Sequence, residues 1–191
     1  MHHRRLLTMQ RGFTLIEMLV SIALFAVIMT MALGALLSLS VADRRAEAVK
    51  SGMDNLTFAL DSMSRAIRTG SVYHCGTGGT ITAQQDCSFG DVYFTFVNAT
   101  GQQVYYQVDL TNSNCGTGYT SCIERSSNGV TWTPITSPDL VINSGEFTVV
   151  GASATVQPTV FLTVTGSVII SGTQQANFYM QTDATQRIYD L

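Results

Sequence analysis

Charged side chains are absent from residues 18–42, a run of 25 residues. At about 1.5 Å of rise per residue, a helix of this length reaches roughly 37 Å, which is enough to cross a hydrocarbon layer of about 30 Å. A cleaved secretory signal has a shorter apolar region, of about 7 to 15 residues, and ends at a small-x-small site. The sequence therefore predicts a membrane segment followed by one soluble domain.

Proline is also scarce, and none of the three prolines lies between Phe13 and Ile67. Beyond the apolar run the chain keeps a helical period, and Gly70 offers a C-terminal stop. We expect one helix of about 55 residues, with its second half amphipathic. The apolar face of that second half comprises Val49, Met53, Leu56, Leu60, Met63 and Ile67.

Two glycines interrupt this expected helix. Each of them, Gly34 and Gly52, costs up to about 1 kcal/mol relative to alanine. Either could mark a bend in the helix. For Gly34, close packing between helices inside a membrane is an equally good interpretation.

No C-x-x-C pair is present, and His74 is the only histidine after residue 3, so the sequence does not favour a structural zinc site. The even number of cysteines after the apolar run is typical of disulfides in an oxidising compartment, which places this part of the chain outside the cytoplasm. Three pairings are open, and nearest neighbours close the shortest loops. The four are Cys75, Cys87, Cys115 and Cys122.

From residue 71 the pattern changes to short runs of aromatic and β-branched residues separated by turns. We expect a hairpin of 92–97 with 104–110, turning at Gly101, and a second hairpin turning at Asn128 and Gly129. Further strands are expected at 146–150, 158–164 and 176–182, with loops at 75–87 and 112–122. The predicted fold is α+β: a long N-terminal helix packed on a C-terminal antiparallel sheet.

Motifs for catalysis are missing as well, including the nucleophile elbow, the phosphate loop and the dinucleotide fingerprint. We therefore expect neither an enzyme nor a bound cofactor or metal. An anchored enzyme would need a convergent polar site in a pocket.

Several other features have an ordinary structural interpretation. The triplets at Asn55 and Asn98 match the glycosylation pattern, which often arises by chance. Asp61 and Arg65 are spaced for a solvated helical ion pair, with Arg68 nearby, and contact with a neighbouring subunit is the alternative. The aromatic residues could form a binding surface, although packing across the sheet is the more usual role; they are Trp132, Tyr105, Tyr106 and Tyr119.

One charge remains in the apolar segment, at Glu17. The string Gly12-Phe13-Thr14-Leu15-Ile16-Glu17, with a basic stretch before it and an apolar helix after it, resembles the cleavage and methylation motif of type IV prepilins. This motif is shared by type IV pilins, type II secretion pseudopilins and competence pilins. Residues 53–70 and 178–188 are similar to J-type minor pseudopilins, and Gly34 stands where many major pilins have proline.

The resemblance implies four segments: a basic leader (1–12), a transmembrane and assembly helix (13–42), an amphipathic helix (43–70) and a β-sheet domain with disulfide loops (71–191). A prepilin peptidase would cut after Gly12 and methylate Phe13, leaving seven basic and thirteen acidic side chains, a net charge of −6. No nucleic acid partner is expected from that charge, outside a role in DNA uptake. The expected location is the inner membrane in a single pass, and then a periplasmic or surface filament.

A carboxylate in a bilayer costs at least about 2.5 to 3.5 kcal/mol, so Glu17 needs a partner. The new amino group of Phe13 on a neighbouring subunit would supply one, and the pair would also fix the axial register of the helices. Solvation of Glu17 at the membrane surface is the alternative. The sequence thus predicts a structural subunit, a minor pilin or pseudopilin that assembles with similar subunits. A filament-tip binding module or adhesin, or a DNA-uptake pilin, is the alternative function.

Overall fold

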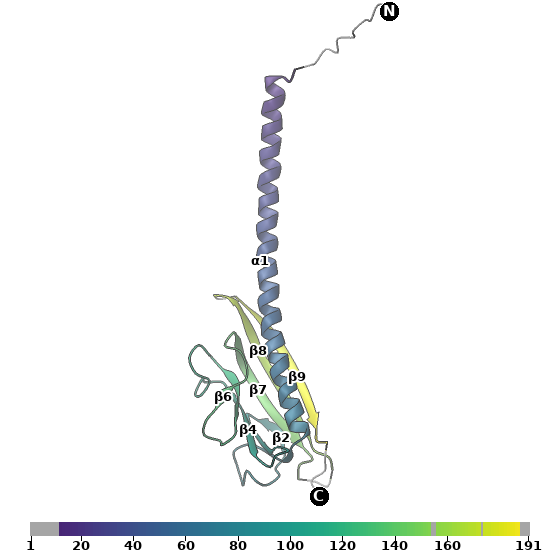
Figure 1. Cartoon of the computed structure of the whole chain (residues 1–191), viewed down its shortest axis with the longest axis vertical. Coiled ribbons are helices and arrows are strands. Elements are labelled where there is room, and N and C mark those ends of the chain that lie inside the picture. Colours follow the sequence, from purple (N-terminus) through teal and green to yellow (C-terminus); the bar gives the residue numbers. More distant parts are fainter. Residues whose placement is uncertain (1–11, 154–155, 173, 188–191) are drawn as a thin grey trace, which may run out of the picture. The chain divides into compact units, whose positions relative to one another are not determined.

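A long helix, α1 (Leu15–Arg68), begins the part of the chain that the computed structural model describes, which covers residues 12–153, 156–172 and 174–187 (Figure 1). The helix confirms the prediction of one continuous element of about 55 residues. It ends two residues before Gly70, whose N–H donates to the carbonyl of Ile67 at 2.9 Å. The chain forms two compact units, residues 1–44 and 45–191. The second half of α1 therefore belongs to the same unit as the strands.

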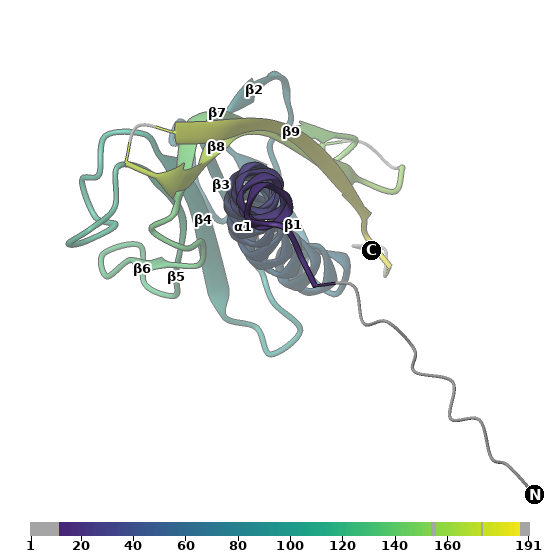
Figure 2. The same ribbon diagram turned by 90° about the horizontal axis from the view of Figure 1, so that it is seen from above.

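The amphipathic face predicted for the second half of α1 is confirmed. Leu56, Leu60, Met63 and Ile67 are each at most 3% exposed, and Met53 packs at the edge of the same core. Two features explain the burial: the apolar residues recur at helical spacing, and the strands lie around this part of the helix (Figure 2). The core of the second unit is thus built on α1.

Gly52 is a point of close approach between α1 and the sheet. A Cβ atom at this position would lie 2.6 Å from Cγ1 of Val168 and 3.5 Å from a methyl group of Leu140. The helix runs through Gly52 without interruption. The structural role of this glycine is therefore to let the helix approach the sheet, and no bend occurs there.

The strands form two antiparallel sheets, where a single sheet was expected. The five-stranded sheet has the order β1-β3-β4-β5-β6, and the four-stranded sheet has the order β2-β7-β8-β9. The first contains β1 (Ser71–Cys75), β3 (Tyr93–Val97), β4 (Gln103–Asp109), β5 (Cys122–Ser126) and β6 (Thr133–Pro134). The second contains β2 (Cys87–Asp91), β7 (Leu140–Val150), β8 (Thr159–Ser171) and β9 (Gln174–Thr185). The α+β class is confirmed, and the two sheets share one core with α1.

Aromatic rings fill the space between the sheets. Phe94 of β3 stacks on Phe147 of β7, with ring centroids 5.4 Å apart, and so joins the two sheets. Tyr73 meets the edges of Phe94 and Phe96 at 5.8 and 6.3 Å. All four rings are fully buried. Offset and edge-to-face contacts of this kind add about 0.5–1.5 kcal/mol per pair beyond their buried area.

Candidate processing and assembly site

Thr14 caps the N-terminus of α1. Its Oγ1 accepts a hydrogen bond from the backbone N–H of Glu17 at 3.3 Å, and helical structure starts at Leu15. Thr14 and Glu17 have the S/T-x-x-E spacing of a capping box, which satisfies helix N–H groups that otherwise lack a partner. The sequence analysis did not identify Thr14 as a functional residue, although this spacing could have revealed it. Because the cap fixes where the helix begins, Gly12 and Phe13 lie outside it and are exposed.

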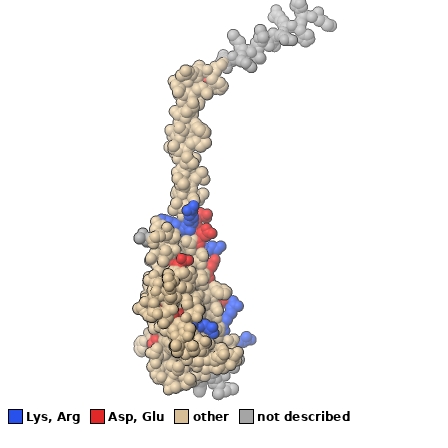
Figure 3. Space-filling model, turned by 60° about the vertical axis from the view of Figure 1, so that its left-hand side comes forward, with Lys and Arg blue, Asp and Glu red and all other residues tan. Residues whose placement is uncertain are grey.

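The helix after the cap is apolar and uncovered. Every residue from Gly12 to Glu47 is exposed, and the most apolar window has a mean hydropathy of 2.5. In Figure 3 the first unit carries almost none of the colour that marks charged residues. Apolar surface of this extent needs a lipid or protein environment. The helix is therefore compatible with membrane anchoring.

Glu17 is the acidic residue in the first turn of α1. Among the described residues, its carboxylate has neither an ion pair nor a hydrogen bond to a side chain, while its backbone groups bond to Thr14 and Ser21. The helix dipole favours a negative charge at this end by about 0.3–1 kcal/mol. The carboxylate is thus available to a partner outside the chain.

Gly34 lies in the middle of the exposed helix. The helix is unbroken there, and nothing lies within 4 Å of a Cβ atom built at this position. Its role in helix flexibility therefore stays a prediction. The predicted basic leader is residues 1–12, of which 1–11 lie outside the described residues. Its cleavage by a peptidase after Gly12 stays a prediction.

The four cysteines form two disulfides in the second unit, Cys75–Cys87 and Cys115–Cys122. These are the nearest-neighbour pairs, and each one closes a short loop. The sulfur atoms of Cys115 and Cys122 lie within 4.8 Å of a carboxylate oxygen of Glu124. Because the two sulfurs are bonded to each other, no thiolate is left at this cluster to bind a metal.

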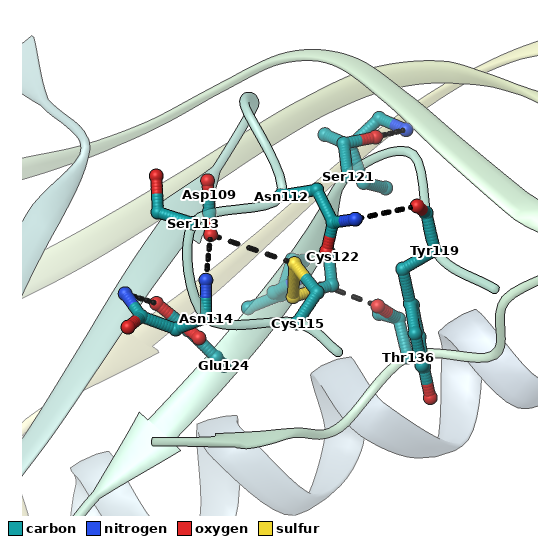
Figure 4. The surroundings of a disulfide bond; sticks show 12 residues. Asp109, Asn112, Ser113, Asn114, Cys115, Tyr119, Ser121, Cys122, Glu124 and Thr136 are labelled. Carbon is teal, nitrogen blue, oxygen red and sulfur yellow. Dashed lines mark hydrogen bonds between the residues drawn. A yellow bond between two sulfur atoms is a disulfide. The ribbon is translucent and has the colours of Figure 1, made fainter. Parts of the chain in front are cut away.

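Two carboxyl groups are buried beside the second disulfide, as Figure 4 shows. Burial raises the pKa of Glu124 to about 7, with a contribution from the charge of Asp109. Burial also acts to raise the pKa of Asp109, but backbone N–H groups of Asn114, Thr111 and Ser113 and the Thr111 hydroxyl outweigh it, so that this pKa is lowered. Asp109 is thus a charged cap for the 109–114 turn. Glu124 is the group of this pair that exchanges a proton near neutral pH.

Of the four aromatic residues singled out in the sequence, two pack together and two lie elsewhere. Trp132 packs on Tyr105 with ring centroids 6.5 Å apart, and Tyr93 lies 6.1 Å from both. Tyr106 points into the core and stacks on Phe96, whereas Tyr119 is half-buried in the 110–121 loop. Packing on the sheet therefore explains Trp132 and Tyr105.

The polar candidates have structural roles as well. His74 is buried, and its Nδ1 and Nε2 lie 2.8 and 2.9 Å from the carbonyl oxygens of Ala83 and Gly78. The side chains of Asn55 and Asn98 accept hydrogen bonds from backbone N–H groups, of Ser137 and of the 98–102 turn respectively. The predicted ion pair between Asp61 and Arg65 is present and exposed.

The N-terminal helix is capped, exposed and apolar, carries one acidic residue, and leads into a disulfide-bonded α+β unit. This arrangement is compatible with a class of protein that is anchored in a membrane through its N-terminus. Comparison with protein families agrees, because residues 7–41 match the prokaryotic N-terminal methylation motif. This match, together with the fold, supports assignment to the type IV pilin and pseudopilin family. The comparisons with curated proteins and with solved structures gave no match.

Proposed function

We propose that this protein is a minor pilin or pseudopilin, a structural subunit of a type IV pilus or of a type II secretion filament. The match to the methylation motif at residues 7–41 supports this proposal most directly. The motif implies processing by a prepilin peptidase and assembly with other pilins. In this proposal the peptidase cuts the exposed bond between Gly12 and Phe13 on the cytoplasmic face. The second unit lies outside the cytoplasm, in keeping with its disulfides.

Assembly would move the exposed apolar surface of residues 13–42 from lipid into a bundle of similar helices. Glu17 would then pair with the amino group of Phe13 on a neighbouring subunit. Because Thr14 fixes the start of the helix, Glu17 lies at a constant distance along the helix from the new terminus. A helix shifted along the bundle would leave both charges unpaired, and breaking a buried pair costs about 3–5 kcal/mol. The pair would therefore select one axial register.

The role in processing is tested by mass spectrometry of the protein purified from its own host cells. We expect a chain that begins at N-methylated Phe13 and contains both disulfides. A chain that retains Met1, or that is cut after residue 40, would contradict the proposal.

The role of Glu17 is tested by Glu17→Gln, which removes the charge and keeps the shape. We expect processing to continue while incorporation into filaments, measured by immunoblots of sheared filaments, falls at least tenfold, since an unpaired buried charge costs about 3–5 kcal/mol. Asp43→Asn is the matched control, because it makes the same chemical change at an exposed position of α1 outside the apolar run. Equal incorporation of the two variants would show that the proposed pair does not set the register.

A further inference from the structure

Phe89 is the most exposed large apolar side chain of the described residues, with 99% of its surface in contact with solvent. It lies in β2, at the edge of the four-stranded sheet and at the periphery of the second unit (Figure 2). A phenylalanine in a strand usually packs on a neighbour, because burying its large apolar ring stabilises the folded chain. Its exposure therefore needs a structural cause.

The cause is a bulge in β2. Cys87 pairs with Val149 and Asp91 with Phe147, so four steps along β2 oppose two steps along β7. Gly90 has a φ of +80°, and a Cβ atom there would lie 2.7 Å from a carboxylate oxygen of Glu146. Only glycine fits this conformation and this contact without strain. The backbone thus directs Phe89 away from the sheet.

The base of the bulge is held firmly. The disulfide joins Cys87 to the buried Cys75 of β1, and Gln85 Nε2 donates to the carbonyl of Cys75 at 2.9 Å. The two contacts of His74 fix the loop before β2, and Asp86 accepts a hydrogen bond from the N–H of Ala152 at 2.7 Å. A fixed backbone lowers the entropy lost when a displayed side chain binds a partner.

A hollow of about 360 Å³ is lined in part by Gly90, the residue that follows Phe89 in the chain. Val92 and Leu110, which are 41% and 40% exposed, supply its apolar surface. The other lining residues are Asp91, Ser144, Gly145, Glu146 and Thr163. The lining residues include two carboxylates and no lysine or arginine. The surface of Phe89, Val92, Leu110, Asp91 and Glu146 is called the Phe89 surface below.

The chain around the Phe89 surface is also negatively charged. Residues 71–191 contain eight Asp and Glu residues and two Arg residues, which gives a net charge of 2 − 8 = −6. An anionic lipid surface or a nucleic acid would be repelled. A second copy of the chain, bound through the same surface, would bring Asp91 and Glu146 close to their own equivalents. A cationic partner is the one that fits.

We propose that the Phe89 surface is a docking site for a protein partner of another sequence, one that offers an apolar pocket for the Phe89 ring bordered by lysine or arginine side chains. The ring would supply most of the affinity, as buried aromatic anchors do at protein interfaces. Asp91 and Glu146 would speed association and exclude acidic partners. This site is separate from the N-terminal helix, so the proposal goes beyond assembly of a filament.

The test uses the full chain in its own host cells, with the photoreactive amino acid p-benzoylphenylalanine placed at position 89. The matched control position is Val130, which is 80% exposed in the turn between β5 and β6. We expect a cross-linked product at 89 that is absent at 130, in which mass spectrometry finds a partner peptide with Lys or Arg beside apolar residues. No product, a second copy, a lipid, or a peptide without basic residues would overturn the proposal.

A second measurement separates the ring from the backbone. With the photoreactive residue at position 92, Phe89→Ser should reduce the product at least tenfold, whereas Val130→Ser should not change it. Both variants should unfold at the same denaturant concentration as the parent chain, because substitutions at exposed positions scarcely change stability. An undiminished product from a folded Phe89→Ser chain would show that Phe89 is not the anchor. Incorporation into filaments is measured in the same cells, so failure of the proposed function is recognised independently.

Discussion

At the scale of single residues, Glu17 combines an observed role of its backbone with a proposed role of its side chain. Its backbone N–H bonds to Thr14 and fixes the start of α1, while its carboxylate is left for a partner outside the chain. The sequence allowed the second role to be predicted, because a lone charge in an apolar run is conspicuous. The first role was not predicted, because a threonine before a helix indicates a cap only when its spacing to Glu17 is considered.

Glu124 should make stability depend on pH. It is fully buried in β5, and one carboxylate oxygen has no hydrogen-bond partner among the described residues. Its pKa rises from 4.5 to about 7 on folding, so the neutral form is favoured in the folded state. The contribution of neutral Glu124 to the free energy of unfolding is complete below about pH 4.5. It is lost as the pH rises from there through 7, by on the order of 3 kcal/mol in all.

The measurement compares denaturant unfolding of the parent chain and of Glu124→Gln at pH 5 and pH 7.5. Glutamine keeps the shape and does not titrate. We expect the free energy of unfolding of the parent chain, relative to the variant, to be higher at pH 5 than at pH 7.5. If the difference between the two chains were the same at both pH values, Glu124 would not be the titrating group.

At the scale of elements, the helix was predicted closely and the strands less well. Apolar spacing and the lack of proline define α1, and both are local properties. The strands 140–150 and 159–171 were predicted too short, because Ser144-Gly145 and Gly166 look like turns. In the structure Ser144-Gly145 is next to a register shift in β7, and Gly166 lies under the ring of Phe178. Such glycines depend on contacts across strands, which a single segment does not contain.

Two strands and one sheet were missed for a related reason. β1 and β2 have five residues each, and the disulfide between Cys75 and Cys87 joins the end of one to the start of the other. β2 carries the bulge at Gly90 and so lacks the alternating pattern of a strand. The Phe89 surface depends on this bulge, and it was therefore not predictable from the sequence.

Gly52 and Gly34 should respond differently to replacement by alanine. In Gly52→Ala the new methyl group would meet Val168, and overpacking of this kind costs about 1–3 kcal/mol, more than the gain of up to about 1 kcal/mol in helix propensity. We expect the second unit to lose about 1–2 kcal/mol of stability, measured by denaturant unfolding. Gly34→Ala, which meets nothing, should leave that value unchanged. Equal values for both variants would contradict the close approach at Gly52.

At the scale of the whole molecule, the two units differ in what stabilises them. The buried core residues of the described chain all lie beyond residue 50, and the two disulfides are in the same unit. Residues 12–44 contribute no buried side chain. The lack of charge in 18–42 led to a similar division in the sequence analysis, whose segment bounds stay a prediction, because it separates a segment suited to lipid from one suited to water. The second unit should therefore fold without the first.

A chain limited to residues 45–191 tests this directly. We expect it to be soluble without detergent, to form both disulfides and to unfold in one cooperative transition, because it retains Gly52, Leu56 and every strand. Its free energy of unfolding should agree within about 0.5 kcal/mol with that of the second unit in the full chain, for which the full chain is measured in detergent micelles. We expect this agreement because the contributions of distant and independent parts to stability are additive. The comparison uses urea denaturation followed by the fluorescence of Trp132. Aggregation of the shorter chain, or a loss of more than about 1 kcal/mol, would show that residues 13–44 stabilise the β-sheet unit.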